Sequence, residues 1–266
     1  MRTFLSDVRQ TLAPDRVSAD GPLPPLLVAL TLVTGLVDAF SYLELGHVFV
    51  ANMTGNVVFL AFSLGGALGF SIPASLTALG AFSLGALGAG RVATRSGPNR
   101  ARMLSHAAAL QTLFLLVAVA LAASSTDPMA PGSRYGLIVV LAGAMGVQNA
   151  TARRLAVADL TTTVLTMTLT GLSADSSIGG GRGSQAGRRV VSIGAMLVGA
   201  LFGVLLVRHV DIAYPLGVAA VVVAGVAASS SVLGRSNPPW TVFRDGKLSP
   251  RPDPEARGDG PQTLSS

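Results

Sequence analysis

Long uncharged stretches dominate this sequence and leave few folds open to it. They cover residues 21–37, 45–90, 103–126, 135–152, 190–207 and 212–234. Most of them approach or exceed the roughly 20 apolar residues with which a helix crosses about 30 Å of hydrocarbon. Only 12% of all residues are charged, against roughly 25% in an ordinary soluble domain. We therefore predict an all-α, polytopic transmembrane helical bundle over residues 24–233 and exclude a water-soluble enzyme.

The two ends of the chain differ from this apolar region. Residues 1–23 are polar, mixed in charge and not followed by a cleavage-site pattern, so we expect a retained cytoplasmic segment. Residues 234–266 are rich in proline, glycine and charge and carry no apolar period. This composition predicts a disordered cytoplasmic tail.

The stretch 45–90 is too long for one helix and contains the polar sequence Asn52-Met-Thr-Gly-Asn56. Residues 71–90 make a good span, whereas 47–66 and its later counterpart 156–173 are ambiguous. Eight full spans would place 12 basic residues inside and 7 outside; six would place 17 inside and leave Arg134 and Arg208 outside. Because cytoplasmic loops carry an excess of Lys and Arg, we favour six full spans plus two shorter or broken, polar-centred segments, with both termini cytoplasmic. The eight-span alternative stays open.

The sequence also contains an apparent internal repeat. Residues 50–57 match residues 157–164 at four of eight positions, and residues 35–39 align with residues 146–150. The repeat units would cover about 24–94 and 135–208. In the six-span arrangement the units run in opposite directions, which is the inverted repeat of many secondary transporters. The alternative is chance similarity between segments rich in alanine, valine and leucine.

Asp38 is the first candidate site residue, because it lies deep within the first predicted span. A carboxylate there costs several kcal/mol unless it is paired, protonated or hydrated. It is therefore either a proton or cation site, or a group that lies at an interface or bonds between helices. Its repeat counterpart is Asn149, which Gln148 precedes.

Two polar clusters complete the candidate site. The first contains Asn52, Thr54 and Asn56, and the second contains Asp159 and Thr161. Non-helical backbone at membrane depth is tolerated only where it is buried in protein or lines a watery cavity. These residues either face a substrate or join helices through hydrogen bonds worth about 1 kcal/mol each.

The same composition argues against several other functions. The chain has no cysteine and three scattered histidines, so we expect no catalytic residues, no metal site and no cofactor. The net charge of +6 comes from basic residues scattered between apolar runs, which we interpret as topology signals rather than a nucleic-acid surface. The expected partners are the lipid bilayer, a small molecule or ion, and a second copy forming a homo-oligomer.

The polar motifs together resemble the YoaK family of bacterial membrane proteins. They are Gly35-Leu-Val-Asp-Ala-Phe-Ser-Tyr42, Val48-Phe-Val-Ala-Asn-Met-Thr-Gly-Asn56, Ala144-Met-Gly-Val-Gln-Asn-Ala150 and Thr161-Thr-Thr-Val-Leu-Thr166. The resemblance covers roughly residues 24–233. It implies a multi-pass protein of the bacterial inner (plasma) membrane, and it implies no substrate or activity.

The repeat, the polar segments and Asp38 favour a small secondary transporter or permease-like protein. The alternative is a non-transporting membrane scaffold or lipid-binding accessory protein, in which the polar clusters only hold helices together. We do not expect an enzyme, because no pair of nucleophile and base is recognisable in the sequence.

Overall fold

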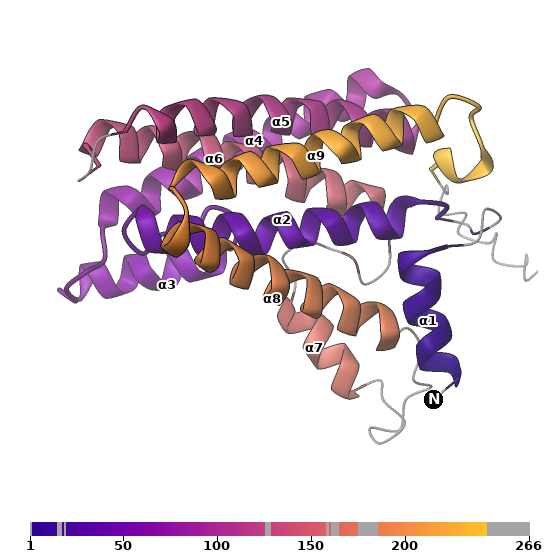
Figure 1. Cartoon of the computed structure of the whole chain (residues 1–266), viewed down its shortest axis with the longest axis horizontal. Coiled ribbons are helices and arrows are strands. Elements are labelled where there is room, and N and C mark those ends of the chain that lie inside the picture. The colour runs from indigo at the N-terminus through magenta and orange to yellow at the C-terminus, as the bar shows by residue number, and fades with distance from the viewer. Residues whose placement is uncertain are drawn as a thin grey trace, which may run out of the picture.

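The computed structural model describes residues 2–14, 18, 20–125, 129–157, 160, 165–174 and 186–243, which form a bundle of α-helices without a β-strand (Figure 1). Six of these helices are long and apolar enough to cross a membrane. They are α2 (Leu23–Glu44), α4 (Ile72–Ser96), α5 (Arg100–Ala123), α6 (Pro131–Leu155), α8 (Ala186–His209) and α9 (Ala213–Leu233). The prediction of an all-α polytopic bundle is confirmed.

Local signals in the sequence explain where several of these helices begin. Prolines lie in the first turns of α2 and α6, where a missing N–H costs little. The Ser71 side chain accepts the N–H of Ala74 at the start of α4, and the Asn99 side chain accepts that of Arg102 at the start of α5. Such caps satisfy N–H groups that have no partner within the helix.

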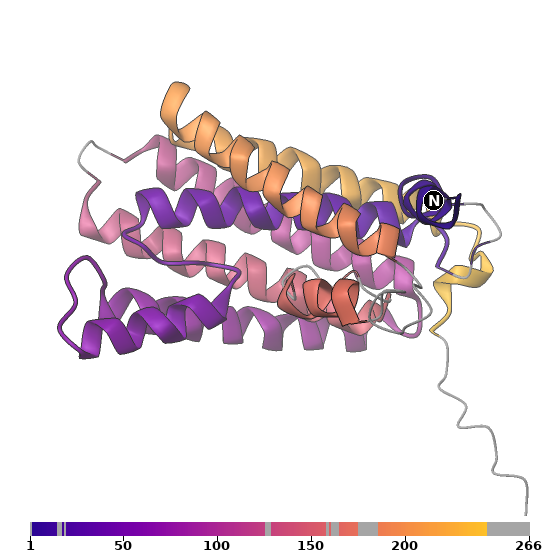
Figure 2. The ribbon, with the colours of Figure 1, turned by 90° about the horizontal axis from the view of Figure 1, so that it is seen from below.

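Three shorter helices complete the described part of the chain: α1 (Arg2–Leu12), α3 (Met53–Leu64) and α7 (Leu165–Ala174). With 12 residues, α3 is about 18 Å long and cannot cross a bilayer. After α2 the chain runs back along the bundle without helical structure, and α3 then returns it to the end where α4 begins (Figure 2). Segment 47–66 is therefore a re-entrant segment, as the six-span arrangement predicts.

The long helices pack in three close pairs, α2 with α8, α4 with α6, and α5 with α9. Glycines allow the first two pairs to approach closely. A side chain at Gly35 would collide with the backbone of Met196 and Ala200, and one at Gly85 would collide with the backbone of Gly143. Small residues that admit a neighbouring backbone are typical of helix interfaces in membranes.

Basic residues gather at one end of the bundle, which we call the basic end. It contains α1, the turn between α4 and α5, the last turn of α6, the start of α8 and the end of α9 (Figures 1 and 2). Among the described residues, Arg134 and Arg208 lie at the opposite end. The basic residues are therefore divided between the two ends as in the six-span count, which sets these two arginines apart from the others.

One part of the chain differs from the predictions for its ends. Residues 2–12, within the segment predicted to be cytoplasmic, form α1, which packs on α8. Residues 234–243 were predicted to be disordered, but a short 3-10 helix (Pro239–Thr241) places Trp240 in a buried position. The indole ring covers Gly21, where no side chain fits, and its large apolar area explains why this segment packs. Residues 244–266 lie outside the described part of the chain.

Candidate functional site

Asp38 holds the innermost turn of the re-entrant segment. Its side chain is 4% exposed, six residues before the end of α2, or about 9 Å inside it. Its Oδ1 atom accepts the N–H of Val50 at 3.0 Å and that of Ala51 at 2.8 Å. Because α3 starts at Met53, this carboxylate lies beside the N-terminus of a helix, where the peptide dipoles favour negative charge.

The second oxygen of Asp38 differs from the first. Oδ2 is buried and has no hydrogen-bond partner among the described residues. Leaving a buried acceptor unpaired costs about 1–3 kcal/mol, and more when the group is charged. This oxygen is therefore the atom at which a proton or a cation would most lower the free energy of the site.

Asn56 holds the same turn from the other side, through a fully buried side chain. Its Nδ2 donates to the carbonyl of Phe49, and its Oδ1 accepts the N–H of Phe49 at 2.9 Å. The amide thus replaces the hydrogen bonds that a neighbouring strand would supply. Gly55 lies directly against the Phe49 ring, which leaves no room for a side chain. Both residues are needed for the extended chain to lie along α3.

The remaining residues of the first polar cluster have weaker contacts. Asn52 precedes α3 and is half-buried, but its side chain makes no capping hydrogen bond. Thr54 is exposed on α3. The structure therefore brings Asp38, Asn52 and Asn56 to one turn and leaves Thr54 on the surface of the helix.

Gln148 belongs to a buried hydrogen-bond chain one helical turn further into the bundle. It accepts from Gln111 Nε2 at 2.7 Å and donates to Thr34 Oγ1 at 2.7 Å, which links α5, α6 and α2. Thr34 lies one turn before Asp38 on α2. Asn149 donates to the carbonyl of Met145 within its own helix. Asp159 and Thr161 lie outside the described residues.

An aromatic cluster, which the sequence analysis missed, covers the re-entrant segment. It contains Tyr42, His47, Phe49, Phe59, Phe62 and Phe70, and ring centroids of its closest pairs lie 5.0 Å apart. The crowding of six rings into residues 42–70 was a signal that could have revealed it. Nearby, Arg134 Nε donates to the carbonyl of Leu45 at 2.7 Å, and Gly46 (φ 83°) leaves space for the guanidinium. These contacts close the bundle at the end opposite the basic end.

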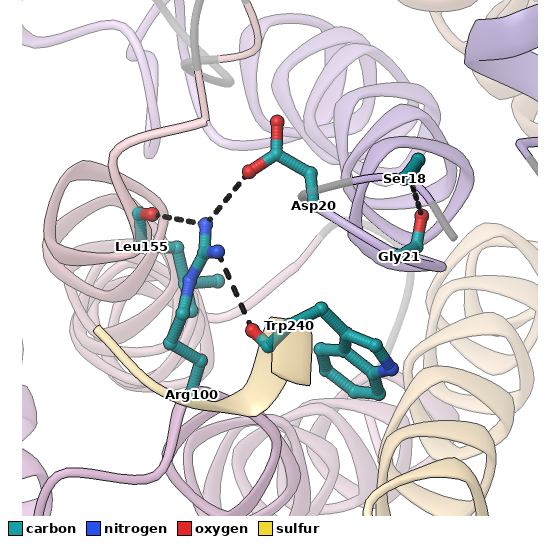
Figure 3. A network of polar contacts seen from close by, with 6 residues as sticks. All are labelled: Ser18, Asp20, Gly21, Arg100, Leu155 and Trp240. Atoms are coloured by element: carbon teal, nitrogen blue, oxygen red, sulfur yellow. Dashed lines mark hydrogen bonds and ion pairs between the residues drawn. The ribbon is translucent and has the colours of Figure 1, made fainter. Parts of the chain in front are cut away.

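Arg100 forms the corresponding contact at the basic end (Figure 3). Its side chain is 4% exposed; Nη2 donates to the carbonyl of Leu155 at 2.7 Å and pairs with Asp20 Oδ1 at 3.2 Å. Nη1 donates to the carbonyl of Trp240 at 3.4 Å. Arg100 therefore joins the approach to α2, the end of α6 and the C-terminal turn. The sequence had offered Arg100 only as a topology signal.

Comparisons with known proteins place the chain among membrane proteins without an assigned activity. A family described as "Protein of unknown function (DUF1275)" matches residues 26–229. The chain is 37% identical over 156 residues to the UPF0700 transmembrane protein YoaK of Bacillus subtilis (strain 168), which covers 57% of this chain and 66% of that protein. No solved structure matches the chain.

Proposed function

Because this chain belongs to the DUF1275 family of YoaK-like multi-pass membrane proteins, whose function is unknown, we propose a function from its own geometry. We propose that it is a small secondary transporter for a small molecule or an ion. The observation that supports this proposal is the re-entrant turn, where α3 begins inside the bundle beside Asp38, and where one buried carboxylate oxygen has no partner among the described residues. Interrupted helices whose ends face a site within the membrane are typical of secondary transporters.

Matching contacts in the two halves support an inverted repeat as part of this proposal. Gly35 of α2 lies against Met196 and Ala200 of α8, and Gly146 of α6 lies against Phe82 and Ala86 of α4. Gly35 of α2 corresponds to Gly146 of α6 at an offset of 111 residues, and residues of α4 correspond to residues of α8 at an offset of 114 residues. The contact of Gly199 with Leu32 corresponds in the same way to that of Gly85 with Gly143. We therefore propose two units, α2 to α4 and α6 to α8, that run in opposite directions.

The proposed orientation follows from the charges. We place the basic end, with the N-terminus and the C-terminal segment, on the cytoplasmic side of a bacterial inner membrane. Transport by such a protein requires its site to open to one side at a time. For the site to open to the cytoplasm, the contacts of Arg100 would have to break. For it to open to the other side, the contacts of Arg134 and the aromatic cluster would have to break. The protein needs no cofactor or catalytic group for this, and a second copy of the chain is a compatible partner.

Thiol accessibility tests the proposal without a known substrate. Ala51 is 2% exposed and lies next to Asp38, and the natural chain has no cysteine. We expect Ala51→Cys to react with a membrane-impermeant thiol reagent in both right-side-out and inside-out vesicles, because each side gains access in turn. The control is Ala118→Cys, which is 0% exposed in α5 and has no role in opening. Equal protection of both positions, or access to Ala51→Cys from one side only, would contradict the transporter.

The alternative proposal is a non-transporting scaffold or lipid-binding accessory protein. The observation that favours it is the chain from Gln111 through Gln148 to Thr34, in which buried polar groups serve to join three helices. A scaffold function does not require the turn at Asp38 to become accessible from either side of the membrane. It therefore predicts that Ala51→Cys and Ala118→Cys are equally protected from both sides.

A further inference from the structure

A cavity of about 240 Å³ lies at the basic end, between the first turns of α5 and the last turn of α9. We call it the basic pocket. Its polar lining includes Asn99, Arg102, Ser105, His106, Ser231 and Arg235, and no aspartate or glutamate lines it. The pocket is separate from the re-entrant turn and the contacts of Arg100.

The positive groups of the basic pocket have no counterion among the described residues. Within the described residues, the side chains of Arg102 and Arg235 have neither a hydrogen-bond nor an ion-pair partner. Arg100, two residues before Arg102, is by contrast paired with Asp20. His106 contacts Ser96 Oγ through Nδ1 at 3.0 Å, so its Nε2 is left for another group. Two guanidinium groups and an imidazole thus line one cavity, and none of the described acidic residues neutralises them.

The backbone around the basic pocket also favours an anion. The pocket lies at the N-terminus of α5, where peptide dipoles attract negative charge. On the α9 side, the N–H groups of Gly234 and Arg235 donate to the carbonyls of Ser230 and Val232. These bonds satisfy two of the carbonyls at that helix end.

The opposite end of the same helix pair lacks this chemistry. There α9 begins after Asp211, whose Oδ1 accepts the N–H of Ala213 at 2.9 Å. The helix start that corresponds to Asn99 and Arg102 of α5 therefore carries an acid. Within the described residues the positive pocket is specific to the basic end, at the level where α5 and α9 would leave the hydrocarbon of a bilayer.

We propose that the basic pocket binds a phosphate group, through the guanidinium groups of Arg102 and Arg235 with His106 beside them. Arginine pairs recognise phosphate oxygens through charge-assisted hydrogen bonds. The phosphate could be that of an anionic phospholipid in the adjacent leaflet, since basic pockets between helix ends bind such headgroups, or a soluble phosphate. This site does not depend on the protein being a transporter.

Thermal stability of the purified full-length chain tests the proposal. The protein is placed in phosphatidylcholine nanodiscs, in nanodiscs that also contain phosphatidylglycerol, and in phosphatidylcholine nanodiscs with inorganic phosphate. Binding to the folded state raises Tm, and we expect a rise of about 3 °C or more with at least one of the two phosphate sources. The double variant Arg102→Gln/Arg235→Gln should lose that rise. The matched control is Arg91→Gln/Arg95→Gln, which removes the same charge from exposed positions of α4 and should keep it.

Each result has a definite meaning. A rise with phosphatidylglycerol alone assigns the site to a lipid headgroup, and a rise with inorganic phosphate assigns it to soluble phosphate. No rise with either source, or an equal loss in both double variants, overturns the site. If Arg102→Gln/Arg235→Gln does not fold, Ser231→Asp replaces it, because a carboxylate at this exposed position would repel phosphate. A full rise in Ser231→Asp would also overturn the proposal.

Discussion

Two buried polar residues hold the re-entrant turn, and they differ in what they leave unpaired. Asn56 exchanges two hydrogen bonds with the backbone of Phe49, so its amide is used as both donor and acceptor. Asp38 uses one oxygen for two N–H groups, and its other oxygen is buried with no partner in the described part of the chain. Asn56 thus has the character of a structural residue, whereas Asp38 combines a structural contact with an open position for a proton or cation.

Replacing Asn56 with alanine should destabilise the fold strongly. The N–H and carbonyl of Phe49 would lose their partners in a buried place, at about 1–3 kcal/mol for each group. Asn52→Ala is the control, since Asn52 makes no capping hydrogen bond and is half-buried. Thermal unfolding in detergent should therefore show a lower Tm for Asn56→Ala than for Asn52→Ala. Equal losses would mean that the amide contacts do not hold the turn.

Two substitutions separate the role of Asp38 as a hydrogen-bond acceptor from the effect of its charge. Asp38→Asn keeps an oxygen that can accept the N–H groups of Val50 and Ala51 and removes the buried charge, so we expect a Tm close to that of the natural chain. Asp38→Ala leaves both N–H groups without an acceptor and should be destabilised by about 1–3 kcal/mol for each. Thermal unfolding of the two variants checks this. Equal destabilisation would show that the charge, not the acceptor, maintains the turn.

At the scale of helices, the glycine contacts predict equivalent sensitivity in the two halves. An added methyl at Gly35 would meet the backbone of Met196, and one at Gly146 would meet that of Phe82. Overpacking of this kind costs about 1–3 kcal/mol, so Gly35→Ala and Gly146→Ala should lower Tm by similar amounts. Gly88→Ala of α4 is the control, because nothing lies within 4 Å of its added methyl. A loss of similar size in Gly88→Ala would contradict close packing as the cause.

The elements also show which features a sequence can reveal. The six long helices were predictable because each crossing must satisfy its own backbone within one apolar stretch. The shortness of α3 was predictable from the polar residues 52–56 and the distribution of arginines. The partners of those residues were not, because Asp38 meets residues 50 and 51 only after the chain turns back on itself.

Contacts between distant parts of the chain account for the features that the sequence did not predict. Arg100 binds the carbonyl of Leu155 and the carboxylate of Asp20, which lie 55 and 80 residues away. Nothing in the local sequence distinguishes Arg100 from Arg102, which has no such partner. Similarly, Trp240 lies in a segment whose composition resembles a disordered tail, and it is buried because Gly21 leaves a place for the ring.

At the scale of the whole molecule, the arrangement of the ends predicts a labelling pattern in intact cells. Gly97 and Arg153 are exposed at the basic end, whereas Ala67 and Gly132 are exposed at the opposite end. If the basic end is cytoplasmic, single cysteines at 67 and 132 should react with an impermeant thiol reagent, and those at 97 and 153 should react only after the membrane is opened. Reaction at 97 and 153 with protection at 67 and 132 would contradict this arrangement, and a cysteine at the exposed Gln10 then separates its two explanations. If position 10 also reacts, the orientation is reversed. If position 10 is protected, segment 47–66 crosses the membrane, which makes the repeats parallel and removes the inverted arrangement on which the transporter proposal depends.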